Sequence, residues 1–566
     1  MAAKSNDHTL SSPPATPWRV GFGRADITLY EHGMLMMGWG MPYNKALGVA
    51  VPLHARACII ESTQSSSRFA FVVLDTMMIT QGLHLAVLDS LAEPAGARPA
   101  IAEHELILAA THTHSGPSGF AHHFWTNLSA PGFSPKVFDG LVAGVVAAVR
   151  AAAEDLNPAT LAVSQTTVPL SDGVAFNRSW FAYNKNRDVT PVSKARRDEA
   201  TDRAMTVLSA RDASGRLRGV LQWFATHGTT VHASNTQIHP DYKGLAALSL
   251  EAAGLGVVIA QECCGDVSPN YRWDKRRKHN IGKHDDDFAS AQHVADSQVR
   301  HLRSVAPLDA SPDEIPLTGP FTRAVRWVDF SRAAVAPKFS VDGLPQLTNP
   351  ALLGLSMAEG TAEGPGPLRR VRGLNRALSV AARRLRGDPK VPFIDFARGR
   401  DGQLLNFVPL TRTPALDPLL KWVRAALNAG GIHAGSWIPQ VLPINLIRIG
   451  HFAIVGVPFE TTTVAGRRLR ATVRDALPGV KNVVITTYAS AYVGYLTTYE
   501  EYQVQHYEAG YNVFGPHSLD ALRTELTLLC SQLESSPREG PPHAPIDTST
   551  LEKIRFEGPT DGRRWL

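Results

Sequence analysis

Apolar residues occur in short runs along the chain, and each run is followed by a loop and often by an Ala- or Leu-rich stretch. The runs are rich in Val, Ile, Phe and Thr, which favour β-strands, whereas the stretches between them favour helices. The clearest runs cover residues 69–80, 105–114, 219–228, 256–265, 452–460 and 482–490. Strands that alternate with helices predict an α/β fold, with mixed β-sheets flanked by helices in one large catalytic domain.

The two ends of the chain and one internal segment depart from this pattern. Residues 1–18 are rich in Ser, Pro and Thr, which predicts a disordered tail, and residues 534–566 predict a largely irregular tail. The domain is therefore expected over residues 19–533. Within it, residues 340–390 predict an ordered insertion or lid that ends in a basic amphipathic helix. That helix either packs on the domain or lies on a membrane surface.

Composition and charge narrow the classes of function. The formal net charge is only +6, from 57 basic and 51 acidic residues, which does not indicate nucleic-acid binding but is compatible with an anionic membrane surface. The first residues lack the pattern of a signal peptide, and no uninterrupted apolar run reaches the roughly 18 residues of a membrane span. We expect a soluble cytoplasmic or peripheral membrane protein. The four cysteines are too irregularly placed for a disulfide framework.

Chemically reactive side chains cluster where the predicted strands end. In open α/β sheets ligands bind beyond the carboxyl ends of the strands, so these clusters are expected to converge. An extended backbone would place His112 and His114 on the same face of their segment. The other clusters contain His227, Ser268 in the turn GDVSPN, Glu460 ahead of an Arg-bearing helix, and the tyrosines between residues 492 and 507.

Two histidines and one carboxylate form a familiar catalytic zinc set that leaves a position open for water. A tyrosine joins such a set only if the ion lowers its pKa far below the usual value. Each cluster alone also has a structural explanation: a buried histidine, a turn, or a tyrosine-rich packing surface. The GDVSPN segment lacks the GxSxG pattern of a serine hydrolase.

In this order, the motifs resemble the neutral/alkaline non-lysosomal ceramidase family. They include ATHTHSGPSG at 110–119, QWFATHGTT at 222–230, LSMAEGTAEGPG at 355–366, PFETTTVAGRRLR at 458–470 and the tyrosine-rich stretch at 492–519. The resemblance implies one catalytic zinc ion held by His112, His227, Glu460 and Tyr495, with a substrate shell of His114, Arg178, Ser268 and Tyr507. The C-terminal β-sandwich domain usual in the family is not expected here, because the segment after residue 516 is too short for it.

The activity that the resemblance implies is zinc-dependent hydrolysis of the N-acyl amide bond of ceramide, by a metal-activated water, to a sphingoid base and a fatty acid. His114 or Tyr507 would move the proton to the leaving amine, and Arg178 with Tyr507 would stabilise the oxyanion. Ser268 is either a nucleophile or, as we favour, a hydroxyl that orients the substrate. Two alternatives remain: a zinc amidase or esterase acting on another N-acyl or O-acyl lipid, and a catalytically inactive lipid-binding homologue.

Overall fold

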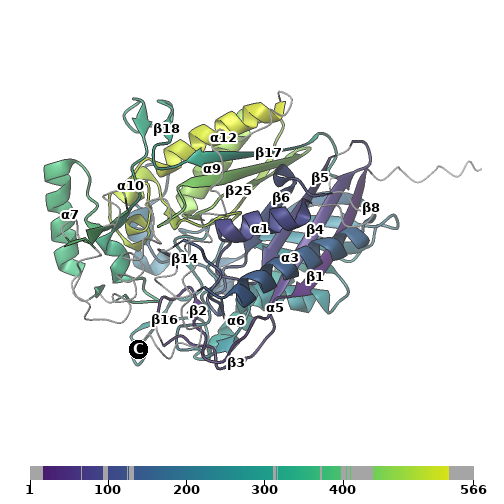
Figure 1. Cartoon of the computed structure of the whole chain (residues 1–566), viewed down its shortest axis with the longest axis horizontal. Coiled ribbons are helices and arrows are strands. Elements are labelled where there is room, and N and C mark those ends of the chain that lie inside the picture. Colours follow the sequence, from purple (N-terminus) through teal and green to yellow (C-terminus); the bar gives the residue numbers. More distant parts are fainter. Residues whose placement is uncertain are drawn as a thin grey trace, which may run out of the picture.

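The computed structural model describes residues 17–41, 43–65, 67–92, 100–123, 125–126, 133–309, 314, 316–366, 368–369, 372–396, 403–404, 408–409 and 437–534. Two β-sheets pack face to face, and helices cover the outer face of each, so the chain forms four layers (Figure 1). The predicted fold class, mixed sheets flanked by helices, is confirmed. The predicted tails lie almost entirely outside the described residues.

The larger sheet has eight strands in the order β13-β11-β10-β8-β1-β4-β5-β6. Neighbours are antiparallel except for the β5–β6 and β11–β13 pairs, which are parallel. The strands are β1 (Trp18–Asp26), β4 (His54–Ser62), β5 (Arg68–Leu74), β6 (Leu106–Ala110), β8 (Asn157–Thr167), β10 (Ala204–Arg211), β11 (Leu217–Phe224) and β13 (Gly256–Gln261).

The smaller sheet has four strands in the order β17-β24-β25-β27. They are β17 (Phe321–Asp329), β24 (Val441–Ile449), β25 (Phe452–Gly456) and β27 (Asn482–Thr486), and only the β25–β27 pair is parallel. All six apolar runs of the sequence contain a strand of one of these two sheets.

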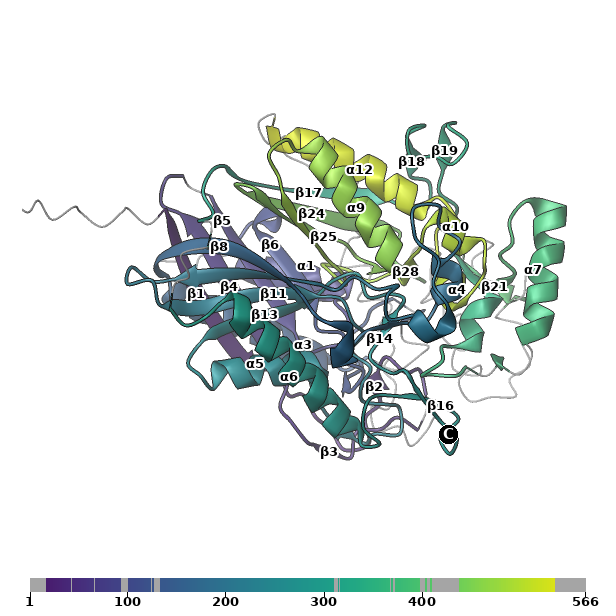
Figure 2. The same cartoon turned by 180° about the vertical axis from the view of Figure 1, so that it is seen from behind.

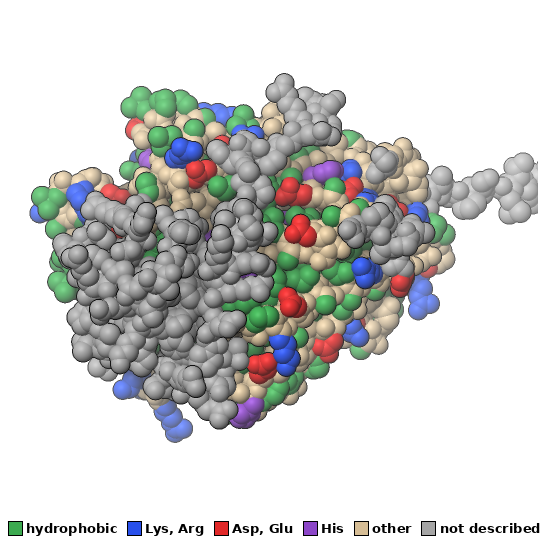
Figure 3. Space-filling model, in the orientation of Figure 1, with side chains coloured by type: hydrophobic (Ala, Val, Ile, Leu, Met, Phe, Trp, Pro, Cys, Tyr) green, Lys and Arg blue, Asp and Glu red, His purple; other side chains and the backbone are tan. Residues whose placement is uncertain are grey.

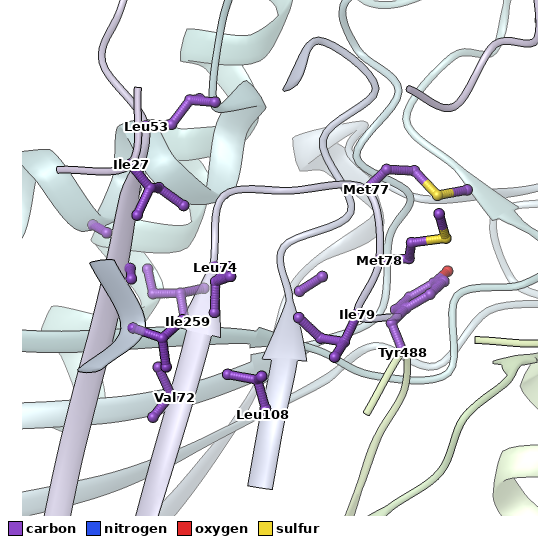
Figure 4. Close-up of a cluster of buried hydrophobic side chains, with 14 of the residues drawn as sticks. Ile27, Leu53, Val72, Leu74, Met77, Met78, Ile79, Leu108, Ile259 and Tyr488 are labelled. Atoms are coloured by element: carbon purple, nitrogen blue, oxygen red, sulfur yellow. The ribbon is translucent and has the colours of Figure 1, made fainter. Parts of the chain in front are cut away.

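In each sheet, side chains alternate between the core that lies between the two sheets and the core under the covering helices. Both faces of the strands are thus buried, which explains why the strand sequences are almost continuously apolar. In β5, Phe69 and Phe71 face the smaller sheet, where they meet residues such as Phe452. The intervening residues of β5, Val72 among them, face the core under the helices. A strand that is buried on both faces gains no stability from polar positions. Figure 4 shows Leu74 at the end of β5 and Leu108 on β6, with Tyr488 beside Ile79.

Helices α1 (Gln81–Leu91), α3 (Pro135–Glu154), α5 (Asp241–Glu251) and α6 (Asp287–Val305) cover the larger sheet, and α9 (Thr463–Ala476) and α12 (Ser518–Glu534) cover the smaller one (Figure 2). Local sequence sets where they begin. Helix α3 starts where the Ser134 hydroxyl accepts a hydrogen bond from the Val137 amide, with Pro135 in the first turn. Acidic and basic side chains are interspersed on the outer surface around α1 and α3, as on a solvated face (Figure 3).

The larger sheet twists and curls until its two edge strands meet. Strand β13 lies at the opposite end of the strand order from β6, yet it lies against β4, β5 and β6. The Gln261 amide, at the end of β13, donates to the Thr111 carbonyl just beyond β6 at 3.1 Å. Accumulated strand twist therefore brings the carboxyl ends of distant strands to one place, where a flat sheet would keep them apart.

The remaining elements belong mostly to the loops, and all but one helix are short. They comprise β2 (Met36–Met37), β3 (Gly48–Val49), β7 (Gly116–Pro117), β9 (Phe176–Asn177), β12 (Gln237–Ile238), β14 (Val267–Ser268), β15 (Arg272–Asp274), β16 (His279–Ile281), β18 (Ala334–Val335), β19 (Gln346–Leu347), β20 (Leu352–Gly354), β21 (Pro392–Asp395), β22 (Gln403–Leu404), β23 (Val408–Pro409), β26 (Glu460–Thr461), β28 (Tyr495–Leu496), and helices α4 (Trp180–Tyr183), α7 (Arg372–Arg386), α10 (Tyr499–Tyr502) and α11 (Tyr507–Gly510). Among the described residues, no helix is both long and apolar enough to cross a bilayer.

The predicted amphipathic helix exists as α7, but its apolar stripe is not the face that packs on the domain. Leu374 is 60% exposed and Leu385 is 84% exposed. The buried residues of this helix are Asn375, which donates to Glu359, and Ala382. Packing on the domain was one of the two alternatives for this helix. The helix does pack there, through a face that lies beside the leucines.

Candidate functional site

Three possible metal ligands meet where the two sheets come together. His112 follows β6, His227 follows β11, and Glu460 begins β26. All three are buried, and their ligand atoms lie within 4.8 Å of one another. Nε2 of His227 is 3.1 Å and Nε2 of His112 is 3.6 Å from Oε2 of Glu460. Ligands of a tetrahedral zinc ion lie roughly 3.4 Å apart when each bond is about 2.0–2.1 Å.

Backbone carbonyls fix the orientation of both rings. Nδ1 of His112 is 2.6 Å from the Met77 carbonyl, and Nδ1 of His227 is 2.7 Å from the Cys264 carbonyl. A carbonyl only accepts hydrogen bonds, so each Nδ1 carries a proton, and each Nε2 is the ring nitrogen left to bind a metal. Burial lowers the pKa of His112 to about 3, which keeps its ring neutral. Such a carbonyl partner is a usual second contact of a metal-binding histidine.

Glu460 and Tyr495 are brought together by a short parallel ladder. They are register partners in the pairing of β26 with β28, and the Glu460 amide donates to the Gly494 carbonyl at 2.8 Å. The hydroxyl of Tyr492 donates to Oε1 of Glu460 at 2.6 Å. Burial alone would raise the pKa of Glu460, but the adjacent His112 and His227 hold that pKa below its usual value. Glu460 is therefore a carboxylate, the form that binds metal.

The Tyr495 hydroxyl lies 3.5 Å from Nε2 of His227 and accepts a hydrogen bond from Arg178 at 2.8 Å. Burial raises the pKa of Tyr495 well above its usual value, and the Arg178 guanidinium opposes that shift. A bound cation would act in the same direction as Arg178. The four predicted ligands thus converge, with Tyr495 at the edge of the group.

Two glycines allow the ligand-bearing segments to cross at close range. A Cβ atom at Gly228, next to His227, would lie 2.2 Å from the His112 carbonyl oxygen. A Cβ atom at Gly265 would lie 2.7 Å from the Glu460 carbonyl oxygen. Real Cβ atoms do not approach backbone this closely, so a side chain at either position would push two ligand segments apart.

The expectation of an extended backbone at residues 112–114 is wrong. Strand β6 ends at Ala110, and His112 has a φ of 69°, in the left-handed region. The two rings nevertheless approach each other, with His114 Nε2 3.2 Å from His112 Nε2. His114 does not belong to the three-residue group, and its Nδ1 has no hydrogen-bond partner among the described residues. Burial lowers the pKa of His114, so the ring is neutral.

Arg178 is held between two buried carboxylates. Its Nε donates to Glu508 at 2.9 Å and its Nη1 to Glu363 at 2.7 Å, while Nη2 donates to the Gly265 carbonyl and to Tyr495, each at 2.8 Å. The side chain is only 5% exposed. Four of its five N–H groups are therefore already used, which leaves little capacity to bind an oxyanion.

Ser268 lies in the same network, through a glutamate that the sequence analysis did not single out. The Ser268 hydroxyl donates to the Glu363 carboxylate, which also accepts from Asn270 at 2.9 Å and from Thr229 at 3.2 Å. Burial would raise the pKa of Glu363, but Arg178 holds it below the usual value. The only sequence signal for Glu363 was its place in the LSMAEGTAEGPG motif.

The ligand group opens into a cavity of about 320 Å³. Apolar side chains of the cavity wall include Trp39, Met77, Met78, Trp125, Met357 and Phe393, and His114, Arg178, Glu363 and Tyr507 add polar groups. Burial raises the pKa of Tyr507 well above its usual value, so its hydroxyl is a hydrogen-bond donor. The residues that the predicted insertion contributes to this wall are Met357, Ala358, Gly360, Thr361, Glu363, Gly364 and Gly366.

Several residues near the predicted clusters have structural roles instead. Asp241 begins α5 and is hydrogen-bonded to Thr230. Arg468 of α9 pairs with Asp188, and Arg470 with Glu262, so these arginines do not balance Glu460. The four cysteines are buried and form no disulfide among the described residues.

Comparison with known proteins agrees with these motifs. The family model described as neutral/alkaline non-lysosomal ceramidase, N-terminal, matches residues 18–384 and 421–524. The neutral ceramidase of Pseudomonas aeruginosa is 34% identical, over 88% of this chain and 70% of the relative. Neutral ceramidase B of Dictyostelium discoideum is 30% identical, over 93% of this chain and 74% of the relative.

Solved structures give the same result. A structure described as a ceramidase complexed with C2 superposes with a TM-score of 0.76 at 32% identity, covering 94% of this chain and 77% of that one. The crystal structure of neutral ceramidase from Pseudomonas aeruginosa gives a TM-score of 0.75 at 30% identity, with the same coverage. The similarity therefore extends over both sheets and the site between them.

Proposed function

Because the chain belongs to the neutral/alkaline non-lysosomal ceramidase family, we propose that it hydrolyses the N-acyl amide bond of ceramide to a sphingoid base and a fatty acid. The observation that carries the proposal is the buried His112, His227 and Glu460 group at the end of a largely apolar cavity. An amide carbonyl at this position would meet a hydrolytic site while its acyl chain stays in apolar surroundings.

The donor set fits one zinc ion. Two imidazole nitrogens and a carboxylate lie at separations suited to tetrahedral ligation, and Tyr495 is in reach as a fourth ligand. Zinc, when bound, supplies Lewis acidity that activates water and polarises the amide carbonyl.

Proton transfer falls to His114 and charge stabilisation to Tyr507. His114 is neutral, faces the cavity and has a free Nδ1, so it is able to take a proton from attacking water and return it to the amine. Tyr507 keeps its proton and donates a hydrogen bond to the carbonyl oxygen as negative charge develops there.

We assign Arg178 a different role from the one expected from the sequence. With its N–H groups occupied, it is better suited to hold the Tyr495 oxygen in place than to bind the oxyanion directly. Its positive charge also favours the phenolate form that a metal ligand needs.

Ser268 is proposed to orient the substrate. Its hydroxyl donates to Glu363, a carboxylate with a lowered pKa and thus a weak base. A serine nucleophile needs a neighbouring base that removes its proton. The Ser268–Glu363–Thr229 group instead offers a hydroxyl and a carboxylate to polar groups of the sphingoid base.

Contact with an anionic membrane is part of the proposal. The exposed leucines of α7 form an apolar stripe at helical spacing, and Arg384 and Arg386 lie on its flanks. Such a helix lies flat in a bilayer interface, with its leucines in the acyl region and its arginines at the head groups.

The decisive assay compares kcat/KM for a ceramide, an N-acyl amino acid and a fatty-acyl ester under the same conditions. We expect ceramide to be preferred, because its two chains supply binding energy that positions the amide. Turnover should rise in micelles that contain anionic lipid, and the rise should shrink as salt increases. Preference for the amino-acid conjugate or the ester would refute ceramide as the substrate but not the zinc hydrolase, whereas bound zinc without turnover of any substrate would indicate an inactive lipid-binding homologue.

A further inference from the structure

A basic hairpin projects beside the candidate active site. It consists of β15 and β16, joined by the sequence KRRK at residues 275–278. Trp273, on β15, is 52% exposed. Tryptophan is a large apolar side chain with one polar N–H group. At a surface position its apolar area stays in contact with water unless a partner covers it.

Three cations at the tip of the hairpin are available to a partner. Arg272 pairs with Asp285, and Arg277 pairs with Asp287. In contrast, Lys275, Arg276 and Lys278 are exposed and have no ion pair among the described residues. Their charge is therefore not neutralised within this part of the protein.

The tip is held in a defined shape. The Asp274 side chain accepts hydrogen bonds from the amides of Arg276 at 2.7 Å and Arg277 at 3.0 Å. The Lys278 amide donates to the Asp274 carbonyl at 2.9 Å. A preorganised turn loses little conformational entropy when its side chains bind a surface.

The base of the hairpin is joined to the wall of the catalytic cavity. The Asn280 amide donates to the Ala362 carbonyl at 2.8 Å, and Ala362 lies between two residues that line the cavity, Thr361 and Glu363. The ring of His232 contacts the Asn280 carbonyl at 3.0 Å and stacks on Trp39, another residue of the cavity wall. Both cartoon views place β16 next to β2, which leads into the same wall (Figures 1 and 2).

We propose that the β15–β16 hairpin docks the enzyme on an anionic lipid surface, with Trp273 at the interface and Lys275, Arg276 and Lys278 among the head groups. Tryptophan prefers the membrane–water interface, and clustered Lys and Arg bind anionic leaflets. The choice of a lipid partner rests on the proposed function, because a lipid substrate must pass from a bilayer to the cavity beside this hairpin. A nucleic acid would bind the same cations, but it would not explain why the hairpin lies next to that cavity.

The test measures binding of the full-length protein to phosphatidylcholine vesicles with and without phosphatidylglycerol. Each cation near such a surface contributes about a five-fold gain in affinity, so Lys275→Gln, Arg276→Gln and Lys278→Gln together should weaken binding to the anionic vesicles by roughly 100-fold at low salt. The matched control removes the same charge elsewhere, through Arg216→Gln, Arg474→Gln and Lys481→Gln, which are exposed positions outside the hairpin. This control variant should lose far less affinity for the anionic vesicles.

Trp273→Ala provides a second test, because an apolar contact does not depend on ionic strength. Its loss of binding should persist in high salt, where that of the glutamine variant disappears. Equal losses in the hairpin variant and its control would overturn the proposal. Unchanged vesicle binding by the hairpin variant would also overturn it, and if that variant had lost binding to RNA, the cations would serve nucleic acid instead.

Cleavage of a short-chain ceramide free in solution separates this inference from the proposed function. The hairpin variants should cleave it as fast as the unaltered protein, because the hairpin contains no residue of the ligand group. If the unaltered protein binds anionic vesicles through the hairpin but does not cleave this substrate, the proposed function fails while the docking surface stands.

Discussion

Replacing Arg178 by Met tests the buried network that surrounds the ligand group. The substitution keeps an unbranched side chain but leaves Glu363 and Glu508, both at most 4% exposed, without their shared counter-charge. Breaking one buried ion pair costs about 3–5 kcal/mol. With two carboxylates affected, we expect a loss near 5 kcal/mol, a large part of the roughly 5–15 kcal/mol that stabilises a typical domain.

The pH dependence of this loss follows from the carboxylates. In the unaltered protein the pKa of Glu363 lies below its usual value, so its stabilising contribution is present at neutral pH and is lost as the pH falls through that lowered pKa. Without Arg178, burial would raise the pKa of Glu363 above its value in the unfolded chain. The variant should therefore be least stable near pH 8 and recover toward pH 5, where the group takes up a proton.

Urea unfolding followed by tryptophan fluorescence measures both effects. A chelator should be present throughout, because metal binding itself depends on pH. Adding Glu363→Gln and Glu508→Gln to the Arg178→Met variant should restore much of the stability at pH 8, since no charge then remains buried and unpaired. A loss below about 1 kcal/mol, or one that is the same at both pH values, would refute the reasoning.

Further predictions concern the chemistry of the site. Replacing either histidine of the ligand group by Ala should abolish both zinc content, measured by elemental analysis, and turnover. His114→Ala should retain zinc but lower kcat by about 10²-fold or more; parallel loss of zinc would make His114 a ligand. Ser268→Ala should lower kcat/KM about 10-fold through one lost hydrogen bond, whereas complete loss would favour a nucleophile. Gly228→Ala should lower zinc affinity and the urea midpoint, because its Cβ meets backbone, whereas Gly373→Ala, which has open space, should do neither.

The strands were predictable because burial on both faces leaves a strong apolar signal in the sequence. That His112, His227 and Glu460 converge was also predictable in kind, since each lies at or near the end of such a run. How these three residues meet was not predictable from the sequence. The expected extended backbone at His112 is replaced by a left-handed residue, and convergence depends on the curl of an eight-stranded sheet. Twist accumulates over many strands, so no local pattern of residues reveals it.

Glu363 and α7 illustrate two further limits of prediction from the sequence. Glu363 contacts Arg178, which lies 185 positions away in the sequence, and a single carboxylate in a glycine-rich segment shows no periodicity. For α7, the helical period of the leucines was correct, but periodicity does not tell which face meets the protein. A polar residue, Asn375, is buried there because Glu359 accepts its hydrogen bond.

The four candidate ligands lie on both halves of the molecule, which would affect how the protein assembles. His112 and His227 follow strands of the larger sheet, whereas Glu460 and Tyr495 follow strands of the smaller one. A single ion bound by all four would tie the two sheets together across 348 sequence positions, from His112 to Glu460. Neither half of the chain alone would supply the full set of donors. Metal uptake would therefore report the docking of the two sheets, and chelation would weaken the seam between them.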